Sequence, residues 1–244
     1  MTYCVAMRLN RGLVFAADTR TSAGSDNVAS FRKLYFWRKP GQRVLVLCSA
    51  GNLAITQSVI SLLNEQLMSD PAPVAETLFT VPSLYRAARV IGDTLRQVRR
   101  TDGAELEAGG AAFNANFLFG GQIGDELPRL FHIYPEGNFI EATDDTPFFQ
   151  IGEHKYGKPI IDRVVEPHMG LGEAAKLALL SFDSTLRSNL SVGLPIDLLI
   201  YECDSLDVRR QRRIEVDDEY FRKLSAAWSE ALRQAFANIE EFKV

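Results

Sequence analysis

Three side chains near the start of the chain have the types and spacing to cleave an amide bond. Thr2 becomes the first residue once Met1 is removed, Asp18 follows sixteen residues later, and Lys33 comes after a further polar stretch. A threonine hydroxyl is a weak nucleophile at neutral pH, but an N-terminal threonine carries its own base, the α-amine. A nearby lysine ammonium favours the neutral amine by like-charge repulsion. Asp18 can supply the counter-ion that a buried lysine needs.

The strands that would position these groups form an expected hairpin. Residues 3–9 and 13–18 both have strand-like composition, and a three-residue loop ending at Gly12 suits the connection between them. Such a loop pairs Thr2 with Arg20 and places the carboxylate at the end of the second strand on the diagonal, facing the same side as Thr2. We therefore expect that carboxylate to lie one short step from the Thr2 side chain.

Five segments carry a more specific pattern. The first three are Ala-Ala-Asp-Thr-Arg-Thr-Ser-Ala-Gly (16–24), Phe-Arg-Lys-Leu (31–34) and Leu-Cys-Ser-Ala-Gly-Asn-Leu-Ala (47–54). Together they resemble the N-terminal third of proteasome β-subunits and their bacterial ring-protease relatives. The opening Met-Thr-Tyr-Cys-Val-Ala-Met-Arg-Leu and residues 151–163 are most similar to the bacterial branch called Anbu. Asp18 keeps that family's spacing from Thr2, whereas Lys33 falls one residue short of it.

The resemblance implies a role for each matching position. Thr2 would be the nucleophile, Asp18 and Lys33 its charge pair, and the backbone N–H of Gly51 an oxyanion donor. The implied substrate-binding residues are Thr21, Ser22, Phe31, Ser49 and Leu53. The last three would line the pocket for the residue before the scissile bond, which suggests a small-to-medium apolar pocket. From the residues alone, Gly51 is simply a turn glycine between a strand and a helix.

A second part of the family's site departs from the pattern. Where the family has a Gly-Ser-Gly turn, this chain has Gly152-Glu153-His154, and the family's Asp-x-x-Ser-Gly appears as residues 188–192. The aspartate is thereby replaced by Ser188, while Ser191 is retained. One hypothesis is that the acidic group has moved to Glu153 and still acts near the Thr2 amine. The alternative is that this part of the site has drifted and that activity is altered or lost.

The chain is long enough and apolar enough to bury a core as one domain. It has 244 residues, of which 46% are hydrophobic. We expect a single domain over residues 1–244, of mixed α and β composition with antiparallel strand pairs. The resemblance specifies an α+β fold, a four-layer αββα sandwich of two antiparallel sheets between helical layers. Further strands are expected at 43–49, 113–119, 129–134, 138–141 and 196–202, and helices at 52–68, 83–100, 171–187 and 217–239, with a Pro-rich break at 71–73 and a loop at 101–111.

Composition also limits the partners that we expect. The net charge of −4 and the pI near 5.5 do not favour a nucleic-acid partner. No apolar run approaches the roughly 20 residues of a membrane span. Three cysteines without metal-like spacing, and an N-terminus that lacks a signal peptide's apolar segment, indicate a cytoplasmic protein. The resemblance implies neither a cofactor nor a metal.

The expected function combines hydrolysis with self-assembly. The resemblance implies a threonine-type peptidase that acts on peptides within a homo-oligomeric, ring-like particle, whereas an ATPase partner stays unknown. Two alternatives stay open, an amidase for a small or unusual amide and a non-catalytic assembly subunit. The last helix supports assembly because it carries an apolar stripe formed by Tyr220, Phe221, Leu224, Trp228, Leu232, Phe236 and Ile239. Part of this stripe is expected to pack on the chain's own core.

Overall fold

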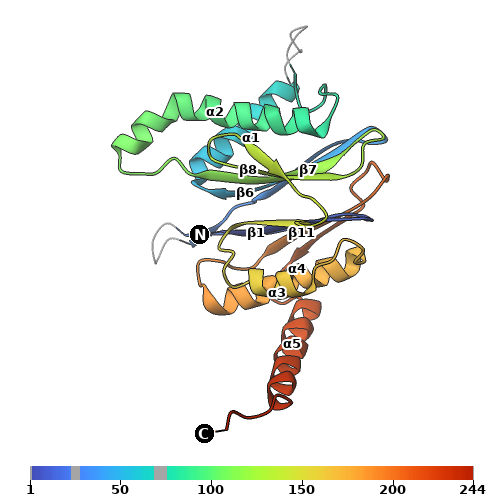
Figure 1. Cartoon of the computed structure of the whole chain (residues 1–244). Coiled ribbons are helices and arrows are strands. Elements are labelled where there is room, and N and C mark those ends of the chain that lie inside the picture. The colour runs from blue at the N-terminus through green and yellow to red at the C-terminus, as the bar shows by residue number, and fades with distance from the viewer. Residues whose placement is uncertain (1, 23–27, 69–75, 244) are drawn as a thin grey trace.

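Two antiparallel sheets lie face to face between two helical layers in the computed structural model of the chain, which describes residues 2–22, 28–68 and 76–243 (Figure 1). The first sheet has the strand order β10 (Phe148–Gly152), β1 (Tyr3–Leu9), β2 (Gly12–Asp18), β11 (Ile196–Glu202) and β12 (Arg210–Ile214). The second has the order β5 (Leu34–Lys39), β6 (Arg43–Gly51), β7 (Ala115–Ile123), β8 (Arg129–Ile133) and β9 (Phe139–Glu141). The expected α+β, αββα sandwich is confirmed.

The helices cover the outer faces of the two sheets (Figure 1). The second sheet is covered by α1 (Leu53–Met68) and α2 (Leu84–Ala108), and the first by α3 (Lys158–Val164) and α4 (Leu171–Ser188). A separate pair of short strands consists of β3 (Arg20–Ser22) and β4 (Val28–Ser30), and α5 (Glu219–Ala237) ends the regular structure. Buried apolar side chains fill each of the three interfaces between layers, which explains why four layers are stable together.

The first hairpin differs from the expected one by one residue in register. Cys4 pairs with Ala17 and Leu9 with Gly12, so the loop has two residues rather than three. Thr2 is therefore not opposite Arg20, and the prediction of that pair was wrong. A one-residue shift matters because it reverses the face that each side chain occupies relative to its partner. Asp18 instead reaches the backbone N–H group of Tyr3, at 3.1 Å.

The helix α2 continues well beyond its predicted end. Residues 101–111 were expected to be a loop, but the helix runs to Ala108 and ends at Gly109. Gly103 lies inside the helix on its buried side, where an added Cβ would approach the Arg99 and Phe113 side chains. Burial against the rest of the protein thus outweighs the weak helix propensity of glycine.

The sequence reading also left some elements out. Strands β3, β4, β5, β10 and β12 and the short helix α3 were not expected. The Pro-rich break at 71–73 lies outside the described residues. Among the residues that are described, no helix combines the length and apolar character needed to cross a membrane.

The final helix α5 projects away from the layers (Figure 1). The start of α5 is anchored to the rest of the protein. Phe221 is buried, and Leu224 packs against the apolar cluster that includes the buried side chains of α4. Farther along, Leu232 and Phe236 are 50% and 81% exposed. The apolar stripe therefore packs on the chain's own core only near its start, as expected for its inner half.

Candidate active site

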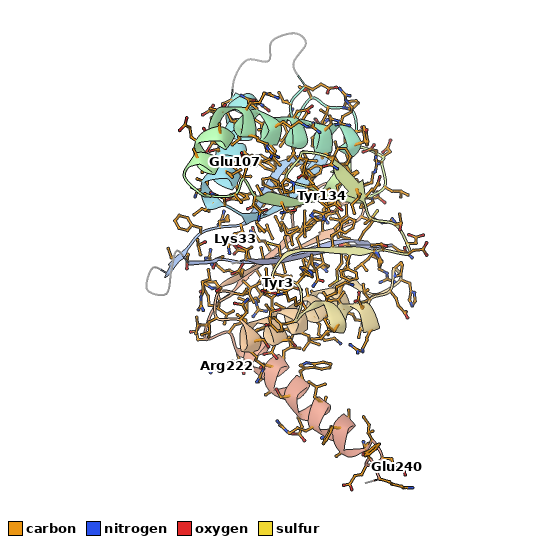
Figure 2. The ribbon with its side chains drawn as sticks, turned by 60° about the vertical axis from the view of Figure 1, so that its left-hand side comes forward. Tyr3, Lys33, Glu107, Tyr134, Arg222 and Glu240 are labelled. Atoms are coloured by element: carbon orange, nitrogen blue, oxygen red, sulfur yellow. The ribbon has the colours of Figure 1, made fainter. Side chains whose placement is uncertain are left out.

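A buried ion pair joins Asp18 at the end of β2 to Lys33. Lys33 Nζ lies 2.7 Å from Asp18 Oδ1, and it also donates to the backbone carbonyl of Arg20 at 2.5 Å. The two side chains are almost completely buried. Figure 2 shows Lys33 near the middle of the molecule, far from Glu240 beyond the end of α5. The expected contact is present, whereas its catalytic role stays a prediction.

The Asp18 carboxylate has two further hydrogen bonds. The N–H group of Tyr3 donates to Oδ1 at 3.1 Å, and the N–H group of Gly193 donates to Oδ2 at 3.4 Å. Burial raises the pKa of Asp18 above its ordinary value, while Lys33 and the two N–H groups oppose that rise. Asp18 thus ties three segments together, namely β1, the segment before β5 and the loop before β11.

The backbone of Thr2 is held from the opposite direction by residues 152 and 153. The Glu153 N–H group donates to the Thr2 carbonyl oxygen at 2.7 Å. Gly152 has φ +81°, and a Cβ there would lie 1.9 Å from the same carbonyl oxygen, so only glycine permits this approach. Gly152 is therefore explained by its close contact with the Thr2 backbone.

Tyr3 anchors the residue that follows Thr2. Its hydroxyl donates to Ser181 Oγ at 2.9 Å and accepts a hydrogen bond from Gln150. Its ring packs on Phe182, with 4.5 Å between the ring centroids. Burial raises the pKa of the Tyr3 hydroxyl, so it stays protonated at neutral pH. The sequence reading assigned Tyr3 only to a strand, because nothing in the sequence showed that its hydroxyl would reach α4.

A cavity of about 660 Å³ opens beside Thr2. It is lined by Thr2, Thr21, Lys33, Ser49, Ala50, Gly51, Asn52, Leu53, Thr56, Asn114, Asn116 and Gly152. Six of the residues predicted for the site therefore meet around one space, although they come from four separate segments of the chain. A concave space of this size beside a candidate nucleophile is suited to a substrate side chain.

Gly51 is the last residue of β6, directly before α1. It has φ +117°, and a Cβ there would lie 2.3 Å from the carbonyl oxygen of Asn114, the residue directly before the neighbouring strand β7. The glycine is thus required by close contact between strands as well as by the turn into the helix. Its backbone N–H group as an oxyanion donor stays a prediction.

Two expectations about the pocket need correction. Phe31 is 38% exposed and is not among the described residues that line the cavity. The cavity also has more polar side chains than the expected apolar pocket implies, since Ser49 and Leu53 are joined there by three asparagines and three threonines. The buried hydroxyl of Thr21 has no hydrogen-bond partner within the described part of the chain. Ser22 ends β3 and pairs through its backbone with Val28.

The second part of the site is arranged around Glu153. Its side chain is buried, and Oε2 accepts a hydrogen bond from Asn189 Nδ2 at 2.9 Å. Asn189 Oδ1 in turn accepts the backbone N–H group of Ser191 at 2.9 Å. Glu153 is thus connected to the Ser191 backbone through Asn189, and its action near the Thr2 amine stays a prediction. Ser188 ends α4 and is exposed.

Three polar residues that line the cavity beside Thr2 were not predicted from the sequence. Asn52, Asn114 and Asn116, which we call the asparagine wall, line the cavity from the start of α1 and the start of β7. A usable signal was present, since two asparagines alternate along a segment that then becomes an apolar strand. Residues with this spacing point to the same face of a strand.

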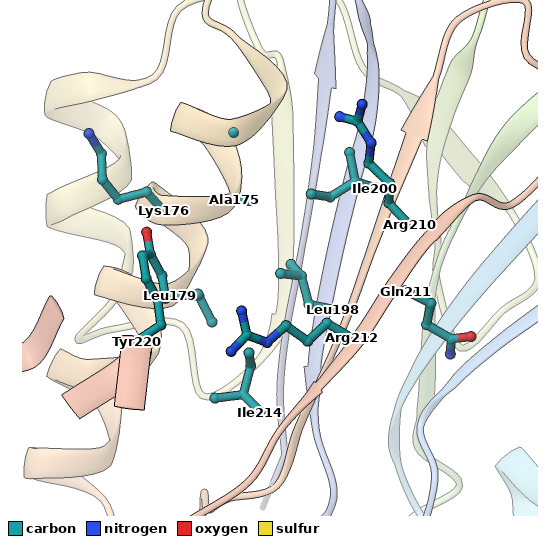
Figure 3. Close-up of a pocket in the computed structure, with 11 residues that line it drawn as sticks. Ala175, Lys176, Leu179, Leu198, Ile200, Arg210, Gln211, Arg212, Ile214 and Tyr220 are labelled. Carbon is teal, nitrogen blue, oxygen red and sulfur yellow. The ribbon is translucent and has the colours of Figure 1, made fainter. Parts of the chain in front are cut away.

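A second cavity shares no lining residue with the first. It measures about 280 Å³ and lies between α4 and the strands β11 and β12 (Figure 3). Leu198, Arg212 and Tyr220 are among the residues around it. The described residues include no cluster of three or more His, Cys, Asp or Glu side chains arranged for a metal ion.

Comparison with known proteins agrees with this geometry. The sequence profile described as "Proteasome subunit" matches residues 2–201. A curated relative, proteasome subunit beta 2 from Pyrobaculum calidifontis, is 27% identical over 198 residues, which cover 81% of this chain and 87% of the relative. The solved Anbu (Gly-1) mutant from Hyphomicrobium sp. strain MC1 superposes with a TM-score of 0.93 at 68% identity, covering 100% of both chains. The helical assembly of the Anbu complex from Pseudomonas aeruginosa gives a TM-score of 0.92 at 48% identity, covering 99% of this chain and 98% of the other.

Proposed function

Because the chain belongs to the proteasome subunit family, we propose that it is a threonine-type N-terminal nucleophile hydrolase that cleaves peptide or other amide bonds. The observation that carries this proposal is the buried Asp18–Lys33 ion pair, since Lys33 lines the same cavity as Thr2. Burial of this pair places Lys33 near the α-amine that Thr2 acquires when Met1 is removed.

The proposed reaction begins at the Thr2 hydroxyl. Its oxygen attacks the carbonyl carbon of the substrate while the α-amine of Thr2 accepts the hydroxyl proton. The amine then returns this proton to the leaving amine of the substrate, and an acyl-enzyme ester remains on the threonine oxygen. Water, deprotonated by the same amine, hydrolyses the ester and releases the acid product. In this scheme Gly51 donates its backbone N–H group to the developing oxyanion.

The charges of the site support that proton transfer. An α-amine has an ordinary pKa of about 8, so a cationic neighbour increases the neutral fraction available at pH 7. Lys33 supplies this cation, and Asp18 is its buried counter-ion. The hydrogen bonds from Tyr3 and Gly193 fix the Asp18 carboxylate, so the ammonium position is fixed as well.

The decisive test is replacement of the nucleophile. Thr2→Ala should abolish amide hydrolysis and covalent labelling by electrophiles that react with N-terminal threonine, whereas Thr2→Ser should retain part of both. Mass spectrometry of each purified protein first establishes that Met1 is absent, because a retained Met1 blocks the proposed base. A Thr2→Ala protein that hydrolyses peptides as fast as the parent would exclude this nucleophile. A processed parent without hydrolysis or labelling would favour the non-catalytic alternative.

We further propose that the chain works as a homo-oligomer. The end of the chain displays apolar side chains, with Phe236, Ile239 and Phe242 at 81%, 70% and 90% exposure. The relative from Pseudomonas aeruginosa that forms a helical assembly supports the same conclusion. Light scattering at micromolar concentration tests it, because a stable species near the monomer mass of 27.2 kDa would contradict assembly. Phe236→Ser should shift the distribution toward smaller species, with the exposed Leu127→Ser as control.

A further inference from the structure

The asparagine wall gives the Thr2 cavity a specific chemical character. It faces a space whose described lining contains one charged residue, Lys33, and no carboxylate. Lys33 already donates to Asp18 and to the Arg20 carbonyl. The hydrogen-bonding groups that the cavity presents to a ligand therefore depend largely on the orientation of the asparagine side-chain amides.

His132 on β8 fixes the orientation of the Asn116 amide, and through it that of Asn114. His132 Nε2 lies 3.2 Å from Asn116 Oδ1, which only accepts hydrogen bonds, so Nε2 carries the proton. Burial lowers the pKa of His132 to about 4, so the ring is neutral at pH 7. Asn116 then donates from Nδ2 to Asn114 Oδ1, at 3.1 Å. With its oxygen occupied in this way, Asn114 presents its NH₂ group to the ligand.

Asn52 is oriented in the same sense by α1. Its Oδ1 accepts hydrogen bonds from the backbone N–H groups of Ala54 and Ile55, at 2.9 and 3.4 Å, and so caps the helix. Its NH₂ group is thereby left for the cavity. The first turn of α1 contains no acidic side chain, and a helix start favours negative charge. Two independent constraints thus turn amide donors, rather than acceptors, toward the ligand.

We propose that the asparagine wall is a specificity subsite for a hydrogen-bond-accepting side chain, a carboxylate or carboxamide as in glutamate or glutamine, on the residue that precedes the scissile bond. This inference rests on the proposed function for the position of the scissile bond. Asn114 and Asn52 donate to the side-chain oxygen of the substrate. Asn116 and His132 are positioning residues, because they fix the orientation of Asn114.

Binding to the Thr2→Ala variant tests the subsite without requiring turnover. Acetyl-Ala-Ala-X-amide peptides with X as Glu, Gln, Leu or Lys are titrated by calorimetry at pH 7. We expect the glutamate and glutamine peptides to bind at least about tenfold more tightly than the leucine peptide, the ratio that one additional good hydrogen bond produces. The lysine peptide should bind most weakly, because a donor would face donors.

Two further substitutions separate the subsite from general effects on folding. Asn114→Leu should remove the preference, whereas Asn138→Leu, in an exposed turn outside the cavity, should retain it. Asn116→Asp is nearly isosteric but accepts hydrogen bonds from both neighbours, so Asn114 turns its oxygen toward the ligand and the preference shifts toward lysine. Equal affinities for the four peptides, or no binding of the glutamate and glutamine peptides at millimolar concentration, would overturn the subsite. If the parent hydrolyses no peptide while the Thr2→Ala variant shows the expected binding preference, only the proposed function is contradicted.

Discussion

The two sides of the Thr2 site hold their carboxylates in different ways. On one side Asp18 is paired with a lysine at 2.7 Å and is inaccessible to solvent. On the other side Glu153 is also buried, but it hydrogen-bonds the neutral amide of Asn189. In sequence, the first side keeps the residue types of the family pattern, whereas the second side departs from them. One buried carboxylate is therefore paired with a cation, and the other is hydrogen-bonded to the side-chain amide of a loop residue.

The two sides are connected through the loop that precedes β11. Glu153 holds Asn189, Asn189 holds the backbone of Ser191, and the N–H group of Gly193 reaches Asp18. Arg20 also donates to the carbonyl oxygen of Leu190, at 2.8 Å, from the first side. We infer that Glu153 acts on the charge pair through the loop backbone, and that its substitution affects Asp18 less than loss of Lys33 does.

The largest expected effect is that of breaking the ion pair. Lys33→Met leaves the Asp18 carboxylate buried without its cation, which typically costs about 3–5 kcal/mol in the free energy of unfolding. Labelling of Thr2 should be lost as well. Urea unfolding monitored by circular dichroism measures the first effect, and mass spectrometry after electrophile treatment measures the second.

The double variant Asp18→Asn, Lys33→Met provides the matched control for that experiment. It removes both charges, so most of the lost stability should return, while labelling should stay absent because the cation is still missing. A double variant that labels as well as the parent would show that the ion pair contributes only to folding.

The second largest expected effect is the pH dependence of stability caused by His132, which is hydrogen-bonded to Asn116 of the asparagine wall. The pKa of His132 is about 4 in the folded protein, against 6.5 ordinarily, because burial disfavours the charged ring. A lowered pKa means that the unfolded chain takes up the proton first, so stability is complete above pH 6.5 and declines as pH falls toward 4. After allowance for partial solvent screening, the loss should be about 2 kcal/mol.

Urea unfolding at pH 7 and at pH 4.5 measures this loss. His132→Asn should reduce the difference in the free energy of unfolding between the two pH values. His168→Asn, at an exposed histidine, should leave that difference as in the parent. An unchanged pH dependence in His132→Asn would assign the acid sensitivity to carboxylates instead.

A smaller effect separates the two explanations of Glu153. Glu153→Gln keeps an oxygen that can accept from Asn189 but removes the charge, so a positioning role predicts a loss of about 1 kcal/mol or less and an unchanged pH–rate profile. A charge role predicts a shifted profile. Glu153→Leu removes the acceptor as well and should cost more, because the Asn189 amide loses its partner. A shifted pH–rate profile in Glu153→Gln would show that the charge of Glu153 takes part in the reaction, as is proposed for the Asp18–Lys33 pair.

The first side of the site could be predicted from the sequence, and the second could not. Asp18 and Lys33 carry opposite charges that require a partner once buried, so their types were sufficient to predict the contact, although only Asp18 keeps the family spacing from Thr2. The partners of Glu153 depend on where the loop after α4 lies, which no local pattern determines. The asparagine wall was missed for a related reason, since Asn52 and Asn114 are brought together only by the pairing of β6 with β7.

The fold was predictable where periodicity was strong. The buried strand β6 and the helix α1 were expected almost within their observed bounds. The end of α2 was not, because residues 101–111 contain glycines and charges typical of a loop, and only burial of one helical face reverses that local preference. The predicted register of the first hairpin was wrong for a different reason. A single glycine admits loops of two or three residues, and pairing with β10 and β11 selects between them.

The smallest expected effect tests whether the second side uses its serines at all. Ser188 is exposed at the end of α4, so Ser188→Ala should change the free energy of unfolding by less than about 0.5 kcal/mol and leave labelling of Thr2 unchanged. Ser191 contributes its backbone N–H group to Asn189, and Ser191→Ala retains that group. Its effect on folding should therefore be equally small. If Ser191→Ala slows labelling while Ser188→Ala does not, the Ser191 hydroxyl acts near Thr2 and the second side takes part in the chemistry. If both variants label at the parent rate, the second side only positions the loop.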